Sequence, residues 1–254
     1  MARKGRRKRA PVYGSKGKDG EGKEKPEEQN ALVEWAKALG GAAVLYIFIR
    51  TFILQTFVIT SGSMEETLLV GDFLVVNRLA LGSRIPGTQK LLPGYADPHR
   101  GDVIVFDPHH EPDLKLVKRL IGLPNDTLEM RDGLLFLNGE AQDEPYVRHE
   151  DPSGDRHDPN WMGWQVDHVL DTVDRGSYRP TRDTWGPLVV PEGEYFMLGD
   201  NRDSSLDSRY WGTLARWRME GRAVFIYFSY DGESAKPFPW IRDTRLGRVL
   251  QLIR

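Results

Sequence analysis

The longest apolar stretch of the chain lies near its N-terminus. From Ala38 to Ile49 there are 12 residues without a charge, and beyond Arg50 the apolar run continues to Ile59, 22 residues in all. A helix that spans a bilayer needs about 20 predominantly apolar residues, with a range of roughly 17–25. The pattern therefore predicts a transmembrane helix over residues 31–52.

Arg50 is the charged residue inside this run, and a charge near the bilayer centre is expensive. If the helix begins near Ala31, Arg50 can snorkel to the far interface, with Trp35 and Tyr46 as interface anchors. A buried helix of a soluble domain and a cleaved signal peptide are the alternatives. The charged run ahead of the apolar stretch is too long for a signal peptide, and no small-residue cleavage site follows at the expected place.

Short apolar or alternating segments, separated by prolines and glycines, follow the apolar run and predict β-strands. They cover residues 72–77, 102–106, 134–137, 195–198 and 223–229. The dipeptide Asn138-Gly139 follows the third of them and is a strong signal for a type I′ hairpin. We therefore expect a mostly β fold behind the N-terminal helix.

Two segments depart from this pattern. Residues 1–30 contain almost no apolar side chains and are expected to form a disordered tail. Residues 145–184 are polar and rich in Asp, Arg and His, and we interpret them as an insertion or a small second lobe. The predicted division is a basic tail over 1–30, a transmembrane helix over 31–52, and a β domain built from 53–144 and 185–254.

Charge is distributed unevenly along the chain. Residues 1–30 hold ten Lys or Arg against five Asp or Glu, a balance of +5, whereas the whole chain carries −2. Basic residues before the helix predict a cytoplasmic N-terminus, so that everything after about residue 52 lies on the outer side of the plasma membrane. The basic residues lack interleaved aromatics apart from Tyr13, so we expect them to meet membrane lipid and no nucleic acid.

The composition limits which catalytic groups and metal sites the chain can form. The chain has no cysteine, which excludes disulfides, thiolate metal sites and a cysteine nucleophile. A covalent mechanism then needs Ser, Thr, Lys or a carboxylate. The six histidines lie in polar stretches without the i, i+4 spacing of a helical metal pair, so neither a metal nor another cofactor is expected. A Ser-His-Asp triad stays open as an alternative.

One lysine has the context of a catalytic base. Strand alternation over residues 114–121 places Lys118 on one face together with Leu114, Leu116 and Leu120. Burial disfavours the ionised form of an amine, so the pKa of Lys118 is expected to be lowered. The alternative is that Lys118 snorkels or pairs with a carboxylate.

A serine partner is suggested by Ser61-Gly62-Ser63-Met64, which directly follows the apolar run. A glycine-containing turn can expose a hydroxyl and direct backbone N–H groups toward a developing oxyanion. The tripeptide Ser-Gly-Ser alone is weak evidence, because it is also a common linker sequence.

Four sequence boxes, in order, resemble those of the type I signal peptidases, a family of Ser-Lys serine proteases. They begin with Ser61-Gly62-Ser63-Met64, followed by Thr67-Leu68 and Gly71-Asp72, and then Arg100-Gly101-Asp102-Val103-Ile104-Val105-Phe106. The third is Lys118-Arg119 with Gly122-Leu123-Pro124 and Asp126, and the last runs from Gly199-Asp200-Asn201-Arg202-Asp203 to Gly212. Together they span residues 61–212.

The resemblance implies a signal-peptidase-like antiparallel β fold with a second, smaller β-rich lobe, and a role for each matching residue. Ser63 is the nucleophile, Lys118 the general base, and the Ser63 N–H with the Ser61 hydroxyl the oxyanion hole. Ser205 orients the Lys118 amine, and Asp207, Arg209 and Arg119 support it. The implied substrates are exported preproteins with small residues at positions −1 and −3 before the cut, bound by shallow pockets lined by Phe57, Ile59, Met64, Leu68, Leu116 and Val117.

The chain departs from the family pattern at four positions. Thr60 and Glu66 stand where proline is usual, Asn125 where glycine is usual, and Ser204 where asparagine is common. Proline would fix φ in both turns, so we expect those turns to be looser here. No catalytic group is lost.

Two other functions fit parts of the pattern. A repressor-type Ser-Lys autoprotease shares the dyad, but residues 1–60 offer a tail and an apolar helix in place of a regulatory domain. A membrane-tethered, β-rich binding protein would use the same boxes only to maintain the fold.

Overall fold

The computed structural model describes residues 27–109, 114–151, 154–155 and 157–254, with residues 27–30 described as helical backbone only. The predicted disordered tail lies outside the described residues up to residue 26. Tyr46–Arg254 form one compact unit, and the described residues before Tyr46 belong to a second.

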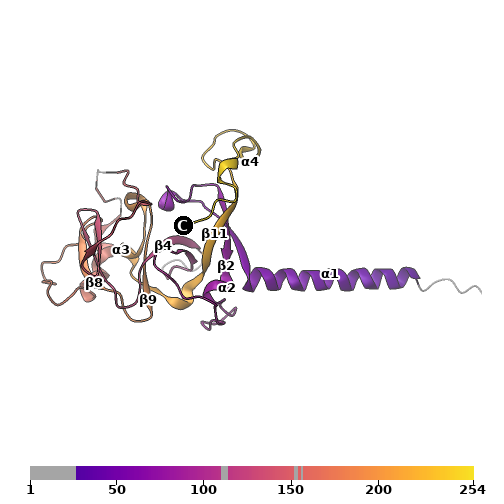
Figure 1. Ribbon diagram of the computed structural model, residues 1–254, viewed down its shortest axis with the longest axis horizontal. Helices are drawn as coiled ribbons and strands as arrows, with labels where there is room; N and C mark the ends of the chain where they lie inside the picture. The colour runs from indigo at the N-terminus through magenta and orange to yellow at the C-terminus, as the bar shows by residue number, and fades with distance from the viewer. Residues whose placement is uncertain (1–26, 110–113, 152–153, 156) are drawn as a thin grey trace, which may run out of the picture. The chain divides into compact units, whose positions relative to one another are not determined.

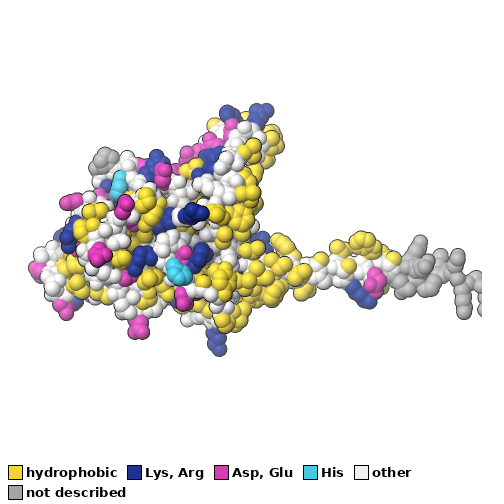
Figure 2. Space-filling view, in the orientation of Figure 1, with side chains coloured by type: hydrophobic (Ala, Val, Ile, Leu, Met, Phe, Trp, Pro, Cys, Tyr) yellow, Lys and Arg dark blue, Asp and Glu magenta, His cyan; other side chains and the backbone are white. Residues whose placement is uncertain are grey.

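The N-terminal helix α1 spans Glu27–Phe52 and is drawn as one unbroken helix in Figure 1. Within it, Ala31–Phe52 is long and apolar enough to cross a membrane, and hydrophobic side chains cover much of its surface in Figure 2. The helix ends where the predicted transmembrane segment ends. Most of the rest of the apolar run forms a strand instead, β1 (Leu54–Val58).

A seven-stranded antiparallel sheet forms the larger layer of the compact unit, with the strand order β1-β2-β11-β3-β4-β9-β10. Besides β1, its strands are β2 (Asp72–Asn77), β3 (Val103–Phe106), β4 (Leu116–Gly122), β9 (Glu194–Leu198), β10 (Leu214–Ala215) and β11 (Met219–Ser229). Strands from both ends of the chain therefore meet in its middle, where β11 lies between β2 and β3.

A second, four-stranded antiparallel sheet has the order β7-β6-β5-β8. Its strands are β5 (Thr127–Arg131), β6 (Leu134–Leu137), β7 (Glu140–Ala141) and β8 (Trp185–Val189). Asn138 and Gly139 join β6 to β7 with φ angles of 51° and 86°, the left-handed geometry that the dipeptide predicts. The predicted fold class, mostly antiparallel β with a smaller β-rich lobe and one N-terminal apolar helix, is confirmed.

Residues 145–184 contribute no strand to either sheet among the residues that the structure describes. They contain the 3₁₀ helix η2 (Pro159–Asp167), and Trp164, Val169 and Tyr178 pack on the core of the smaller sheet. The strands of that sheet come from residues that the sequence pattern grouped with the main β domain. Alternation predicts that a segment is extended but not which sheet it joins.

The remaining helices are single turns. They are α2 (Arg78–Leu81), α3 (Ser208–Trp211), α4 (Pro239–Arg242), η1 (Gly62–Met64), η3 (Arg202–Ser204), η4 (Arg216–Arg218) and η5 (Leu246–Arg248). Three of them, η1, η3 and α3, carry parts of the first and last sequence boxes.

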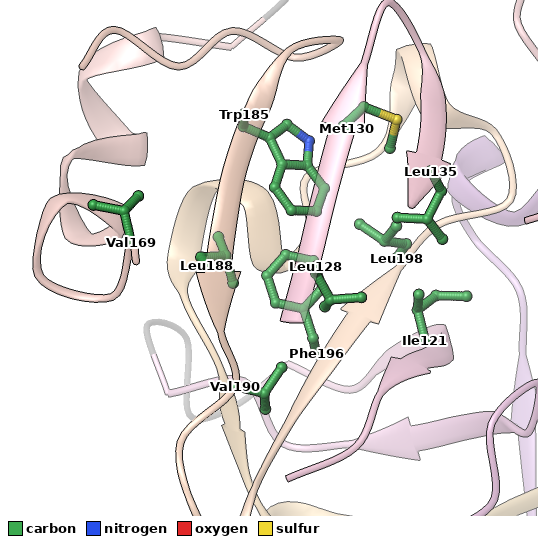
Figure 3. Close-up of a cluster of buried hydrophobic side chains, with 10 residues drawn as sticks. All are labelled: Ile121, Leu128, Met130, Leu135, Val169, Trp185, Leu188, Val190, Phe196 and Leu198. Carbon is green, nitrogen blue, oxygen red and sulfur yellow. The ribbon is translucent and has the colours of Figure 1, made fainter. Parts of the chain in front are cut away.

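One hydrophobic cluster joins the two sheets. It combines Phe196 and Leu198 of β9 with side chains of the smaller sheet, among them Trp185, which stacks on Phe196 at a ring-centroid distance of 5.3 Å (Figure 3). Because β9 also pairs with β4 and leads into the last sequence box, this core fixes two of the elements on which the site is built.

Candidate active site

Ser63 lies in the 3₁₀ turn η1, immediately after the chain leaves β1. The turn is fixed on both sides. Met64 is buried in a core cluster with Ile59 and Leu68, and the Ser63 carbonyl accepts a 3.2 Å hydrogen bond from the backbone N–H of Asn201. The nucleophile candidate is thus held by the core on one side and by the last sequence box on the other.

Lys118 lies in β4, near the middle of the larger sheet, opposite Ile104 of β3. Its Nζ is 2.5 Å from Ser63 Oγ, within hydrogen-bonding distance. Both side chains are shielded from solvent, since Lys118 is 2% and Ser63 8% exposed. The structure brings together the two residues that the sequence singled out as nucleophile and base.

Burial lowers the pKa of Lys118 to about 8. The carboxylates of Asp207 and Asp200 act in the opposite direction by stabilising the ammonium form, and Arg209 adds to the lowering. A lysine with this pKa is partly neutral near neutral pH, as a general base must be.

Two buried ion pairs surround the dyad. Arg209 donates to Asp207 through Nε at 2.8 Å and Nη2 at 2.9 Å, and Arg119 donates to Asp200 through Nε at 2.8 Å and Nη2 at 2.6 Å. Burial alone would raise the pKa of the Asp207 carboxyl, but Arg209 holds that pKa below its usual value. The Arg119 guanidinium also lies 3.9 Å from the centre of the Tyr146 ring.

Ser205 is buried, and its hydroxyl helps to lower the pKa of the Asp207 carboxyl by hydrogen bonding to it. It lies against Gly199, where an added Cβ would be 2.2 Å from Ser205 Oγ and 2.5 Å from the Ser63 carbonyl oxygen. The absence of a side chain at Gly199 therefore allows Ser205 and the nucleophile turn to approach each other. Asp207 Oδ2 accepts the Gly199 N–H at 3.0 Å and fixes this backbone.

A hollow of about 190 Å³ adjoins the dyad. Its walls are residues 58–61 and 114–118, together with Ser63 and Met64. Four of the expected substrate-binding residues line it: Ile59, Met64, Leu116 and Val117. Ser61, expected in the oxyanion hole, lines it as well, and its hydroxyl makes no capping hydrogen bond to the turn that it precedes.

Phe57 and Leu68, also expected to bind substrate, do not line the hollow. Leu68 is fully buried, and Phe57 packs against the same cluster. The sequence reasoning missed Val58, Thr60, Leu114 and Lys115, which do line it. Their position next to Ile59 and Leu116 on the same two segments was the signal that could have found them.

Glu66 has a φ of 86°, which proline cannot adopt. Proline therefore could not fix the turn in this conformation, and the expectation that the turn is looser stays a prediction.

Metal ligands do not gather in the part of the chain that the structure describes, where no group of three or more His, Cys, Asp or Glu could hold an ion. The site as described consists of a serine, a lysine, buried ion pairs and an adjoining hollow. This arrangement can activate a hydroxyl for attack on a carbonyl.

Comparison with known proteins gives a consistent result. Residues 32–228 match the family model described as signal peptidase, peptidase S26. Signal peptidase I of Pseudomonas fluorescens is 36% identical over 82% of this chain and 76% of its own length. Signal peptidase I of Bacillus licheniformis is 35% identical over 80% of this chain and 92% of its own length. A crystal structure of a signal peptidase I from Enterococcus faecalis, 33% identical, matches with a TM-score of 0.33 over 50% of this chain and 96% of the other.

Proposed function

The chain belongs to the signal peptidase family, peptidase S26, and we propose that it removes N-terminal signal peptides from exported preproteins as a membrane-bound serine endopeptidase with a Ser63–Lys118 dyad. The observation that carries the dyad is the 2.5 Å separation of Lys118 Nζ and Ser63 Oγ, both buried beside an apolar hollow.

The reaction begins when neutral Lys118 takes the proton of the Ser63 hydroxyl while Oγ attacks the scissile carbonyl. The oxyanion that forms accepts hydrogen bonds from the Ser63 N–H and the Ser61 hydroxyl. Lys118 then gives its proton to the amine of the mature protein, which leaves. The signal peptide remains as an ester on Ser63.

Hydrolysis of this ester uses the same groups again. Lys118 takes a proton from water as the water oxygen attacks the ester carbonyl, and returns the proton to Ser63 as the acid product leaves. Ser205 orients the Lys118 amine during both proton transfers. The ion pairs Asp207–Arg209 and Asp200–Arg119 keep the surrounding backbone in place.

The hollow supports substrates with small residues at positions −1 and −3. An extended peptide that binds there would place at least two side chains in its volume of about 190 Å³, against walls that are largely apolar. An Ala-X-Ala sequence before the cut suits such a space better than larger side chains do.

The membrane topology completes the proposal. Helix α1 anchors the protein in the plasma membrane, the basic N-terminal segment stays on the cytoplasmic side near lipid headgroups, and the β domains work on the outer side. Because Ser63 follows the span closely in sequence, it meets the cleavage region of a membrane-inserted signal peptide near the bilayer. Residues 53–144 and 185–254 make the catalytic domain, and 145–184 an insertion or second lobe.

The test is to incubate the purified full-length protein, in detergent, with a preprotein that carries an Ala-X-Ala site, and to sequence the N-termini of the products. We expect a single new N-terminus directly after the second alanine. A protein that only binds the preprotein leaves it intact, and a cut elsewhere contradicts the proposed specificity.

A further inference from the structure

Three charged side chains lie beside Ser63 but take no part in the dyad or in the lining of the hollow. Glu65 and Glu150 flank Arg148, with Glu65 Oε2 at 3.6 Å from Arg148 Nη1 and Glu150 Oε1 paired with Arg148 Nη2. The side-chain amide of Asn201 donates to Glu150 Oε2 at 2.9 Å and to Glu65 Oε2 at 3.4 Å. We call Glu65, Arg148, Glu150 and Asn201 the exit cluster.

The exit cluster is tied to the nucleophile turn through the backbone. Asn201 donates its N–H to the Ser63 carbonyl at 3.2 Å, and Glu65 donates its N–H to the Gly62 carbonyl at 3.0 Å. Arg148 is fixed between two residues of the last sequence box, since its N–H donates to Asp200 and its carbonyl accepts from Arg202. These charges therefore have fixed positions relative to Ser63.

Accessibility differs within the cluster. The side chains of Arg148, Glu65 and Glu150 are 43%, 25% and 25% exposed, so an incoming peptide can reach them. Asn201 is 1% exposed, and its Oδ1 has no hydrogen-bond partner among the described residues. Buried amide oxygens are normally paired, so this one is an unmatched acceptor within the cluster.

The course of the chain indicates which part of a substrate meets the cluster. The walls of the hollow, residues 58–61 and 114–118, run with increasing residue number into Ser63 and Lys118. Glu65 follows Ser63 instead, and Asn201 contacts the Ser63 carbonyl. A peptide whose residues before the cut occupy the hollow must send its residues after the cut past Ser63, out of the hollow.

We infer that the exit cluster contacts the first residues of the mature protein and selects among substrates by their charge. This inference rests on the proposed signal peptide cleavage. Two carboxylates and one guanidinium give the cluster a net charge of −1 at neutral pH. A basic residue just after the cut can pair with Glu65 or Glu150, whereas an acidic residue is repelled by both and attracted only by an Arg148 that is already paired.

The test uses two preproteins that are identical except for Lys or Asp at position +2, and a third with Ser there. Partly exposed ion pairs contribute a fraction of a kcal/mol to about 1, so we expect the wild-type protein to cleave the Lys substrate about two- to fivefold faster in kcat/KM than the Asp substrate. Arg148→Gln should increase that ratio. The double variant Glu65→Gln with Glu150→Gln should bring it below one, and high salt should move the ratio toward one in every protein.

The Ser substrate reports damage to the site in general, because a cluster that only braces the turn lowers kcat/KM for all three substrates equally. A variant of the exposed Glu192, Glu192→Gln, serves as the matched control and should leave the ratio unchanged. A Lys-to-Asp ratio that stays the same in all the cluster variants overturns the inference. If the wild-type protein cleaves none of the three substrates, the proposed function fails instead.

Discussion

Lys118 carries an ionisable amine at a buried position, where the charged form of the amine is costly. Burying an amine in a low-dielectric site disfavours the ammonium form, and two nearby carboxylates compensate only in part. Arg209 and Arg119 neutralise those same carboxylates, so neither acid is free to hold Lys118 fully charged. The buried ion pairs thus permit a lysine whose pKa suits proton transfer.

The pKa of Lys118 sets the pH dependence of cleavage. Because the base must be neutral, kcat/KM is expected to rise with pH, with a midpoint at about 8, and to level off above it. The measurement is kcat/KM for one preprotein from pH 6 to 10. A kcat/KM that is still rising steeply at pH 10, as expected for the ordinary lysine pKa of 10.5, would contradict the account.

The pH dependence of the free energy of unfolding reports the pKa of Lys118 independently of activity. Between pH 8 and 10.5 the unfolded chain keeps a proton on Lys118 that the folded chain has lost, so the free energy of unfolding should rise with pH in this window. Lys118→Met removes this contribution. The free energy of unfolding of the wild type, relative to that of Lys118→Met, should therefore rise between pH 8 and 10.5. Denaturant titrations of both proteins at several pH values measure this change.

Gly199 is a second residue whose identity is dictated by its neighbours. A Cβ there would lie 2.2 Å from Ser205 Oγ and 2.5 Å from the Ser63 carbonyl oxygen. Gly199→Ala should displace the nucleophile turn and lower kcat/KM by about 100-fold. Gly163→Ala is the control, since nothing lies within 4 Å of an added Cβ at that position. Equal activity in the two variants would argue against the tight contact.

At the scale of elements, the sequence pattern predicted most strands of the larger sheet closely. The expected segment 72–77 is β2, 195–198 lies within β9, and 223–229 is the second part of β11. It missed β1, because an apolar run does not show by its period where a helix ends and a strand begins. It also missed β8, whose sequence Trp-Gly-Pro-Leu-Val contains two residues that usually interrupt strands.

The candidate site was predictable only in part. Alternation in the segment around Lys118 indicated a buried lysine, but its partner Ser63 came from the order of the boxes, which the family resemblance supplied. The resemblance gives residue identities and not side-chain directions, so Leu68 was assigned to substrate although it points into the core. The contact between Glu65 and Arg148 joins segments remote in sequence, and no local pattern reveals it.

The backbone conformation of the turn that follows Ser63 can be tested by substitutions at Glu66. Glu66 has a φ of 86°, a conformation that costs a residue with a Cβ about 1–2 kcal/mol and that proline cannot adopt. Glu66→Gly should raise the free energy of unfolding by up to about 1 kcal/mol, after the entropy that glycine adds to the unfolded state. Glu66→Pro should lower both stability and kcat/KM. If Glu66→Pro is the more stable variant in thermal unfolding, the turn has the conformation that proline favours.

At the scale of the whole molecule, anchoring and catalysis are assigned to different parts of the chain. The compact unit Tyr46–Arg254 contains the dyad, both sheets and the hollow, whereas most of the apolar span lies before it. The two functions should therefore be separable.

A chain that begins at Tyr46 should still cleave a preprotein in detergent but should no longer sediment with lipid vesicles. The full-length protein should stay with the vesicles in high salt, because an apolar helix, unlike a basic tail, is not released by screening. Release of the full-length protein by salt would show that its charges hold it to the membrane.

The most direct test of the account is the rate at which Ser63→Ala and Lys118→Met cleave a preprotein with an Ala-X-Ala site, with product N-termini sequenced. Loss of either group should reduce kcat/KM by roughly 10⁴-fold or more, as for other serine nucleophile–base pairs. The exposed Ser177→Ala should cleave like the wild type. Wild-type activity in either dyad variant would contradict the assignment of Ser63 as nucleophile and Lys118 as base.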